Sequence, residues 1–409
     1  MASTLFKTTL SRLGVRVPIR VAHITLNMRT GGIENFILNF SRKIDRIRFE
    51  LTVGCLDGGG VLLDDIDRLG HKSFVLSRRP GLDLSLIFEL AKKFRKAGYH
   101  IIHTHNQASH FYAGLAARLA GVPCLITTEH SRHHIDLKLR RRIEKFFLSR
   151  ITDAWITVSA DLAHAAVQKD GLSRAKVAVI PNGIDTDLFS ITESPEHKKH
   201  LNELRGSLEI QQDARVAIIV ARLDPVKNHS MLLRALSSSE LLKRRVCLLI
   251  VGDGELRDEL TNLSRNLGLE RCVRFLGLRR DIPDLLALSD LFVLCSHTEG
   301  LPLSLLEAMA AKVPVLITRP ANKARLIMDG RNGRVVDHSS EALGQGILEL
   351  LEAQSKFASF AEKAAELISE SYAIDSMMHR YEKLYLDLCD GIAKTSKEMR
   401  LNSGDCHLA

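Results

Sequence analysis

Short apolar runs rich in β-branched residues alternate with amphipathic stretches, and this scheme occurs twice along the chain. Before residue 190 the runs are VAHITLNM (21–28), FELTVGCL (49–56), KSFVLS (72–77), HIIHTH (100–105), CLITTEH (124–130) and AWITVS (154–159). After residue 190 they are RVAIIVARL, RVCLLIVGDG, VRFLG, DLFVLCS and VPVLIT. Alternation of strands with helices, where the strands are continuously apolar, indicates parallel sheets covered on both faces. The sequence therefore predicts an α/β protein with two Rossmann-like, doubly wound domains facing a central cleft.

The break between the two halves falls near VIPNGIDTDLF (179–189), where Pro, Asn and Gly interrupt the pattern. A chain of 409 residues suits two domains. We expect an N-terminal domain over 1–190, a second domain over 191–372, and a C-terminal helix within 373–409. This helix is expected to pack back on the N-terminal domain and to end in a polar tail.

Positive charge is concentrated in the first half of the chain. Residues 1–190 contain 28 Lys and Arg against 17 Asp and Glu, whereas the remainder is slightly acidic. Clusters such as KKFRK (92–96) and KLRRRIEK (138–145) carry much of this excess. Solvated helix surface is one interpretation, and an anionic partner is the other. An acidic membrane surface is favoured over nucleic acid, because no interleaved aromatics or nucleic-acid motif accompany the charge.

Membrane contact is expected to be peripheral. No apolar run approaches the roughly 18 residues of a membrane span. The first 20 residues lack acidic side chains, and Leu5, Phe6, Leu10 and Leu13 could form a short apolar stripe; a membrane-surface helix and a frayed tail are the alternatives. The seven scattered cysteines are typical of reduced thiols in a cytoplasmic protein. The expected location is therefore the cytoplasm, at the inner face of the membrane.

Several loops that follow predicted strands carry residues suited to a bound anion. Gly31 and Gly32, in TGGIENF, open a helix whose N–H groups could face a phosphate, although a tight turn is the alternative. Arg222 and Lys227, in ARLDPVKN, suit a diphosphate, although surface charge is common in loops. Gly252, in VGDGEL, adds a glycine-rich turn at another strand end.

Histidines and glutamates mark further candidate positions. The histidines at strand ends are either structural or part of one site, and they are His103, His105 and His130. Glu299 and Glu307 lie in HTEGLPLSLLEAMA (297–310), where eight steps of about 100° would leave them about 80° apart on a helix. The spacing therefore favours one carboxylate in a loop and the other in the helix that follows.

The order of these motifs, over about residues 20–385, resembles the retaining, nucleotide-sugar-dependent glycosyltransferases of group 1 (family 4-like) with the GT-B fold. The resemblance implies that Glu299 contacts the donor sugar and that Glu307 binds the ribose. It implies that amides of Gly300 and Leu301 hold the donor, and that loops after VRFLG hold its base.

The same resemblance implies roles for the cations and histidines. Arg222 and Lys227 would stabilise the leaving diphosphate, helped by amides of Gly31 and Gly32, so that neither a metal nor another cofactor is required. His130 matches the active-site histidine near the transferred sugar, and His105 with Asn106 would lie on the acceptor side. The implied donor is a UDP-, GDP- or ADP-sugar.

The sequence departs from the family pattern at two places. The stretch ITRPANKARLIMDG (317–330) lacks the usual Gly-Gly and Glu, and Lys312 replaces the glycine that usually ends the helix.

The expected function is transfer of a sugar to a saccharide acceptor, lipid-linked as in synthesis of lipopolysaccharide or other cell-surface polysaccharides. The alternatives are a non-catalytic nucleotide-sugar-binding subunit and a transferase that uses a small soluble acceptor. A phosphate-using relative is disfavoured, because no pyridoxal-binding lysine motif is present.

Overall fold

The computed structural model describes residues 17–131, 139–190 and 194–404, which form two compact α/β units. The first unit contains β1–β7 and the last helix from Met378 on, and the second runs from Pro181 to Met377. Each unit is built on one parallel sheet, so the predicted pair of doubly wound domains is confirmed.

The first unit has a seven-stranded sheet in the order β3-β2-β1-β4-β5-β6-β7. Its strands are β1 (Ile19–Thr25), β2 (Phe49–Cys55), β3 (Lys72–Val75), β4 (Ile101–Thr104), β5 (Cys124–Glu129), β6 (Ala154–Thr157) and β7 (Val177–Val179). Its helices within this stretch are α2 (Gly32–Lys43), α3 (Leu63–Arg68), α4 (Leu84–Ala97), α5 (Gln107–Ala120), α6 (Leu139–Ile151), α7 (Ala160–Gln168) and the 3-10 turn η2 (Arg174–Lys176). All neighbouring strands pair in parallel, and His23 of β1 is in register with His103 of β4.

The second unit repeats this plan with the order β10-β9-β8-β11-β12-β13. Its strands are β8 (Arg215–Val220), β9 (Val246–Val251), β10 (Val273–Gly277), β11 (Leu291–Leu294), β12 (Val315–Thr318) and β13 (Arg334–Val336). Its α-helices are α8 (Pro195–Ser207), α9 (His229–Leu236), α10 (Ser239–Lys243), α11 (Arg257–Asn266), α12 (Ile282–Ala287), α13 (Leu303–Ala310), α14 (Ser340–Glu352) and α15 (Gln354–Ser371). Short 3-10 turns are η3 (Thr186–Phe189), η4 (Pro225–Lys227) and η5 (Arg319–Asn322).

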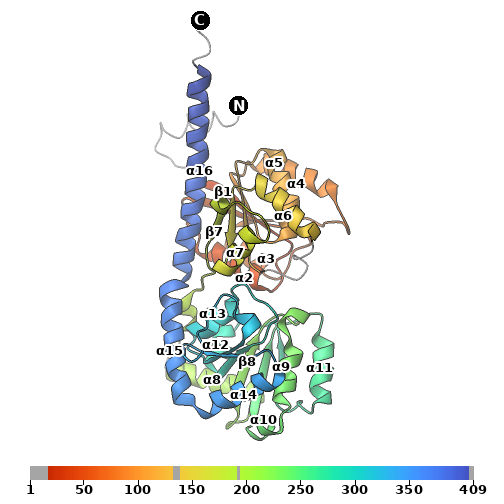
Figure 1. Cartoon of the computed structure of the whole chain (residues 1–409), viewed down its shortest axis with the longest axis vertical. Coiled ribbons are helices and arrows are strands. Elements are labelled where there is room, and N and C mark those ends of the chain that lie inside the picture. The colour runs from red at the N-terminus through yellow and green to blue at the C-terminus, as the bar shows by residue number, and fades with distance from the viewer. Residues whose placement is uncertain (1–16, 132–138, 191–193, 405–409) are drawn as a thin grey trace. The chain divides into compact units, whose positions relative to one another are not determined.

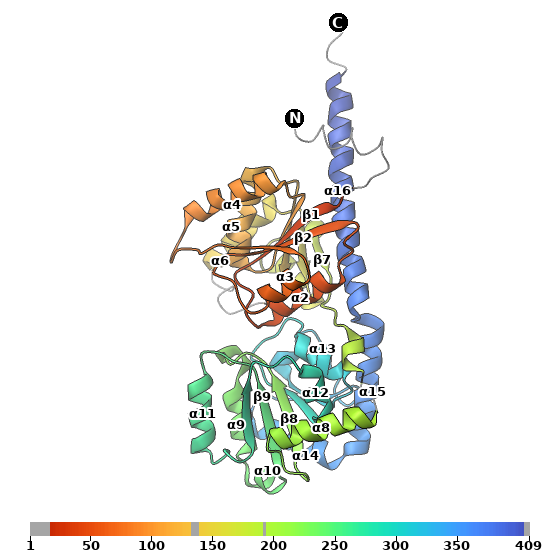
Figure 2. The ribbon, with the colours of Figure 1, turned by 180° about the vertical axis from the view of Figure 1, so that it is seen from behind.

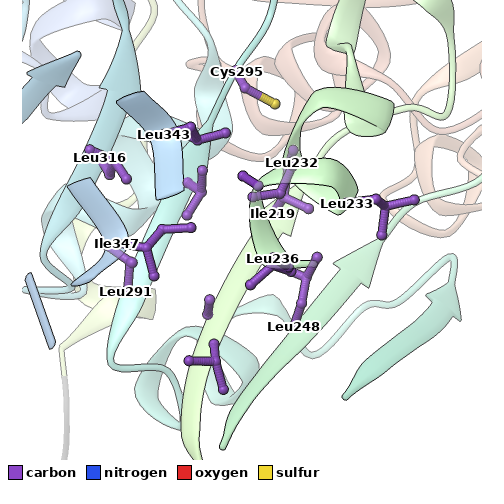
Figure 3. Close-up of a cluster of buried hydrophobic side chains, with 14 of the residues drawn as sticks. Ile219, Leu232, Leu233, Leu236, Leu248, Leu291, Cys295, Leu316, Leu343 and Ile347 are labelled. Carbon is purple, nitrogen blue, oxygen red and sulfur yellow. The ribbon is translucent and has the colours of Figure 1, made fainter. Parts of the chain in front are cut away.

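The apolar strands become the centre of each unit because helices cover them. In the second unit, Leu232 and Leu236 of α9 and Ile347 of α14 pack with strand residues such as Ile219 and Leu248 (Figure 3). In the first unit, α4 and α5 pack against one another over a core that includes Phe94 and Leu125. This burial supplies the main driving force for both units.

The last helix, α16 (Ile374–Gly404), belongs to the first unit from Met378 on. It lies beside β1 and β2 in both views (Figures 1 and 2), and Tyr381 and Tyr385 are fully buried there. Its Glu382 accepts a hydrogen bond from the backbone N–H of Asp45 (3.0 Å) and pairs with Arg48.

The chain passes into the second unit after Ile180, before the expected boundary at residue 190. Residues after Pro181 are tied to the second unit by hydrogen bonds. The Asn182 amide donates to the carbonyl of Leu301 (2.8 Å), and the N–H of Ile184 donates to the carbonyl of Tyr372 (3.0 Å). The Pro-Asn-Gly sequence is therefore the start of the second unit.

No helix among the described residues is long and apolar enough to span a membrane.

Candidate functional site

Two loops of the second unit meet where the order of its strands reverses. β8 pairs with β9 on one side and with β11 on the other, and the loops after β8 and β11 leave the sheet at this point. The N–H of His297 donates to the carbonyl of Val226 (2.8 Å), which ties the loops together. Ligands of doubly wound sheets bind beyond the carboxyl ends of the strands at such a reversal. Arg222, Lys227 and Glu299 all lie in these two loops.

Lys227 and Glu299 form a partly buried ion pair. The Lys227 Nζ lies 2.6 Å from Glu299 Oε1, and the Ser296 hydroxyl donates to the same oxygen at 2.6 Å. The exposed fraction is 21% for the lysine side chain and 8% for the glutamate side chain. A carboxylate this poorly hydrated needs the opposite charge beside it. The two predicted residues are therefore brought together, and they bind each other.

Arg222 differs from Lys227 in its exposure. Its side chain is exposed, and its Nε lies 3.6 Å from Oδ2 of Asp224. The other oxygen of Asp224 accepts a hydrogen bond from the backbone N–H of Lys227 (3.2 Å) and caps η4. Asp224 therefore shapes the loop that carries both cations, and the guanidinium remains accessible to a ligand.

The glutamates occupy different elements, as the spacing predicted. Glu299 precedes α13 and Glu307 lies within it, with Pro302 at the N-cap. Gly300 and Leu301 are buried just before the helix, and the Leu301 carbonyl is used by Asn182. No hydrogen bond to the Glu307 carboxylate occurs among the described residues. Loss of hydration raises the pKa of Glu307 to about 7.

Gly252, the other glycine predicted as a site residue in the second unit, is required by the packing of the backbone. Gly252 has φ of 133°, and a Cβ placed there would lie 2.0 Å from the carbonyl oxygen of Ala221. Glycine is required where two backbones approach this closely. The structure thus accounts for Gly252 without a ligand.

The stretch that departs from the family pattern contributes a further cation. After β12 the chain forms η5, and Lys323 Nζ donates to the hydroxyl of Thr298 at 3.0 Å. Thr298 is the residue before Glu299. Lys312, the other departure, has φ of 55° and follows α13, so a lysine occupies a left-handed position that favours glycine.

The first unit presents its candidates at the equivalent reversal, between β1 and β4. Gly31 is the N-cap of α2, and a Cβ at Gly32 would meet nothing within 4 Å. Packing therefore does not explain Gly32, in contrast to Gly252. His105 lies directly after β4, and His130 lies directly after β5.

His105 and His130 are in contact within this unit. Nδ1 of His105 lies 3.2 Å from Nε2 of His130, and the His130 ring packs edge-on against Phe36. His105 is 1% exposed, and burial holds its pKa well below 6.5. Burial lowers the pKa of His130 to about 3. Both imidazoles are therefore neutral near pH 7.

Asn106 has a structural role that its sequence context signals. Its side-chain oxygen accepts a hydrogen bond from the N–H of Ser109 (2.8 Å), and the Ser109 hydroxyl accepts one from the N–H of Asn106. This is a capping box at the start of α5. The pattern Asn-x-x-Ser before a helix could have predicted it.

The sequence interpretation missed the buried partners of His105. His23 of β1 lies 3.0 Å from His105, and Tyr385 of α16 hydrogen-bonds both His23 and His103. A histidine inside the apolar run VAHITL was the available signal. The contribution of α16 had no local signal, because it depends on tertiary contacts.

Comparison with known proteins places this geometry in a family. The profile "Glycosyltransferase Family 4" matches residues 30–188, and "Glycosyl transferases group 1" matches residues 202–367. The UDP-Gal:alpha-D-GlcNAc-diphosphoundecaprenol alpha-1,3-galactosyltransferase of Escherichia coli is 30% identical over 332 residues, covering 78% of this chain and 84% of that protein. The N-acetyl-alpha-D-glucosaminyl L-malate synthase of Bacillus anthracis is 26% identical over 313 residues, covering 76% and 80%.

A solved structure supports the fold. Anabaena HepE in complex with UDP and glucose has a TM-score of 0.77 and 22% sequence identity, covering 90% of this chain and 100% of that one. The two sheets and these likenesses define a nucleotide-sugar-dependent glycosyltransferase with the GT-B fold. Within that class, the chain belongs to the group 1 glycosyltransferases.

The Lys227–Glu299 pair generates a stability prediction. Lys227→Met should lower the free energy of unfolding by about 1–3 kcal/mol, because Glu299 remains buried without its counter-charge. Lys227→Met combined with Glu299→Gln should recover most of this loss. Arg222→Met is the control, because its exposed side chain should change stability by no more than about 0.5 kcal/mol. Urea unfolding measures all four proteins, and equal stability of Lys227→Met and the parent would contradict the prediction.

A second prediction follows from the raised pKa of Glu307. Below about pH 7 its carboxyl is protonated, and above that pH it is charged and becomes a stronger hydrogen-bond acceptor, which would strengthen nucleotide binding if Glu307 binds the ribose hydroxyls. Nucleotide affinity should therefore rise between pH 6 and pH 8. In Glu307→Gln this part of the pH dependence should disappear, although other titrating groups remain. Calorimetric titration of both proteins across this range is the measurement, and identical pH profiles would contradict the assignment.

Proposed function

We propose that the protein transfers a sugar, with retention of anomeric configuration, from a nucleotide diphosphate sugar to a lipid-linked saccharide in cell-surface polysaccharide synthesis. The observation that carries this proposal is the group of Arg222, Lys227 and Glu299 at the strand reversal of the second unit. Two cations on one loop, Lys227 paired with Glu299 and the exposed Arg222 near Asp224, match a donor that carries a diphosphate next to sugar hydroxyls. The name of the Escherichia coli relative, which includes a diphosphoundecaprenol-linked sugar, supports the lipid-linked acceptor.

The ion pair suggests how the donor is held. An ammonium group has three donors, so Lys227 can keep Glu299 and still bind a phosphate oxygen. Both contacts of Glu299 described above use Oε1, so Oε2 can accept a hydrogen bond from a sugar hydroxyl. Arg222 then supplies the second cation. The amides at Gly300 and Leu301 complete the proposed donor contacts of the second unit.

Transfer would break the bond between the anomeric carbon and the diphosphate oxygen and form a bond from the acceptor oxygen to that carbon. The departing phosphate would take the proton of the acceptor hydroxyl on the same face of the sugar, which gives retention. Negative charge develops on the diphosphate during this step, where fixed cations lower the barrier. His130 would contact the transferred sugar, with His105 behind it on the acceptor side.

The decisive test is a donor panel. Incubation with UDP-, GDP- and ADP-sugars and a saccharide-diphospholipid acceptor should release nucleotide with one donor, and the anomeric proton coupling in the product should show retention. Arg222→Ala should lower turnover about 10²–10³-fold, because it removes an electrostatic contact that is strongest in the transition state. Tight donor binding with no release under any condition would favour a non-catalytic subunit, and an inverted product would exclude retention.

The proposed chemistry needs no metal, because Arg222 and Lys227 would neutralise the charge of the diphosphate. Activity should survive complete removal of divalent cations by EDTA. The measurement is nucleotide release before and after chelation, with magnesium or manganese added back as the control. Loss of activity that either metal restores would contradict the assignment of charge neutralisation to Arg222 and Lys227.

The surface of the first unit supports a peripheral site on an anionic membrane at the cytoplasmic face. α5 contacts both α4 and α6, and the three helices lie together in Figure 1. α4 carries the KKFRK cluster near its C-terminal end, and α6 carries Arg141, Arg142 and Arg150. Large apolar side chains are exposed on or next to the same two helices, and they are Leu82, Leu84, Phe88, Ile143, Phe146 and Phe147. Basic and apolar groups together suit a lipid surface. The N-terminal stripe lies outside the described residues.

Vesicle flotation tests this surface. The protein should float with vesicles rich in phosphatidylglycerol at low salt and be released by high salt, because surface charge is screened. Phe88→Ser with Phe147→Ser should weaken flotation, whereas Met328→Ser, at an exposed methionine of the second unit, should not. If the parent protein does not float with these vesicles, a small soluble acceptor is favoured. The name of the Bacillus anthracis relative includes such a compound, L-malate.

A further inference from the structure

A continuous chain of hydrogen bonds runs through the core of the first unit and ends at His130. It contains seven side chains from β1, β4, β5, α16 and the loops after β4 and β5. In order, they are Tyr381, Thr128, His103, Tyr385, His23, His105 and His130. The first six are at most 1% exposed. The proposed function uses only the last two members of this chain.

The distances are those of ordinary hydrogen bonds. The Tyr385 hydroxyl lies 2.6 Å from Nδ1 of His103 and 2.9 Å from Nε2 of His23. Nε2 of His103 lies 2.7 Å from the Thr128 hydroxyl, which lies 3.2 Å from the hydroxyl of Tyr381. Beyond His23, the links to His105 and His130 measure 3.0 Å and 3.2 Å.

The buried imidazoles are neutral, so the donor–acceptor direction of each hydrogen bond depends on that of its neighbour. Burial lowers the pKa of His23 to about 3 and that of His103 well below 6.5. A neutral imidazole has one N–H donor and one acceptor nitrogen, and a hydroxyl has one proton. A ring that accepts a hydrogen bond at one nitrogen must therefore donate one from the other nitrogen. The direction of one hydrogen bond fixes the direction of all of them.

The tyrosines decide that direction. Among the described residues, the Tyr381 hydroxyl has only Thr128 as an acceptor, and the Tyr385 hydroxyl has only the two imidazoles. A buried hydroxyl proton without an acceptor is costly. Tyr381 must then donate to Thr128, Thr128 to His103, His103 to Tyr385, Tyr385 to His23, and His23 to His105. Nδ1 of His105 finally donates to Nε2 of His130.

We propose that this chain fixes neutral His130 with its proton on Nδ1, so that it presents a hydrogen-bond donor at the strand reversal of the first unit. Its partner would be an oxygen of the transferred sugar, a role that rests on the proposed function. Tyr381, Tyr385, His23 and His103 are then positioning residues, because they act through His130. Protonation of His130 would set two N–H groups face to face, so the chain also favours the neutral ring.

A metal centre is the competing explanation for this cluster. His23, His103 and His105 each offer a nitrogen within 4.8 Å of the others. However, Nδ1 of His23 and Nε2 of His105 are directed at each other at hydrogen-bond distance, and Tyr385 occupies the other nitrogen of His23. The hydrogen bonds account for these nitrogens without an ion.

The test is the tautomer of His130, measured by long-range ¹H–¹⁵N correlation in the full chain labelled with ¹⁵N-histidine. His130→Gln assigns the signal. We expect the Nδ1–H form, which is the less common tautomer of free histidine. Tyr385→Phe should move His130 towards the Nε2–H form, because it removes the hydroxyl that orients His23. Tyr381→Phe should have the same effect, because it removes the hydroxyl that donates the first hydrogen bond. This variant replaces Tyr385→Phe in the experiment if Tyr385→Phe does not fold.

Tyr99→Phe is the matched control. Tyr99 is a buried tyrosine of the same unit whose ring packs against Phe94 and which is not one of the seven hydrogen-bonded side chains, so loss of its hydroxyl should leave the His130 signal unchanged. In an active preparation, Tyr385→Phe should lower kcat about 10- to 100-fold with a smaller change in the donor KM, by analogy with the loss seen when the partner that orients a metal-binding histidine is removed.

Three results would overturn the proposal: an Nε2–H tautomer in the parent, no tautomer change in either tyrosine variant, or a stoichiometric metal that His103→Ala removes. The tautomer does not depend on turnover. An Nδ1–H signal in a protein without transferase activity would therefore uphold the chain and reject the proposed function.

Discussion

The reversal of strand order in each parallel sheet determines where this protein can carry chemistry. Each sheet grows in both directions from its first strand, β1 or β8. Because crossover connections are right-handed, the helices change faces at this strand, and the loops on either side of it diverge. Backbone and side chains at that point are left accessible. Gly32 and His105 occupy the position in the first unit, and Lys227 and Glu299 occupy it in the second.

The Lys227–Glu299 pair of the second unit and the histidine chain of the first satisfy their poorly hydrated polar groups in different ways. In the second, opposite charges are placed side by side, with Ser296 as an additional donor to Glu299. In the first, neutral imidazoles and hydroxyls are linked in series from α16 to His130. Both solutions restrict the side chains before any ligand arrives, which lowers the cost of reorganisation during binding and reaction.

Local patterns were sufficient to predict both sheets, because their long apolar runs leave few alternatives. The edge strands 177–179 and 334–336 were missed, since three residues carry too little pattern to recognise. Candidate loops at strand ends were predictable from the fold rule, whereas the contact between Lys227 and Glu299 was not. The histidine chain was least accessible, because Tyr385 lies 362 residues beyond His23 and only the register of β1 with β4 brings His23 and His103 together.

The first unit is interrupted in sequence by the second, which has a consequence during synthesis. Roughly 200 residues separate Ile180 from Met378, and at about 5–20 residues per second a ribosome needs about 10–40 s to make them. Throughout that interval the nascent sheet lacks Tyr381 and Tyr385, so His23 and His103 have no hydroxyl to join them. All residues of the second unit, by contrast, have been synthesised before the last segment of the first unit. The fold of the first unit, which begins at the N-terminus, is thus completed only when residues close to the C-terminus have been made.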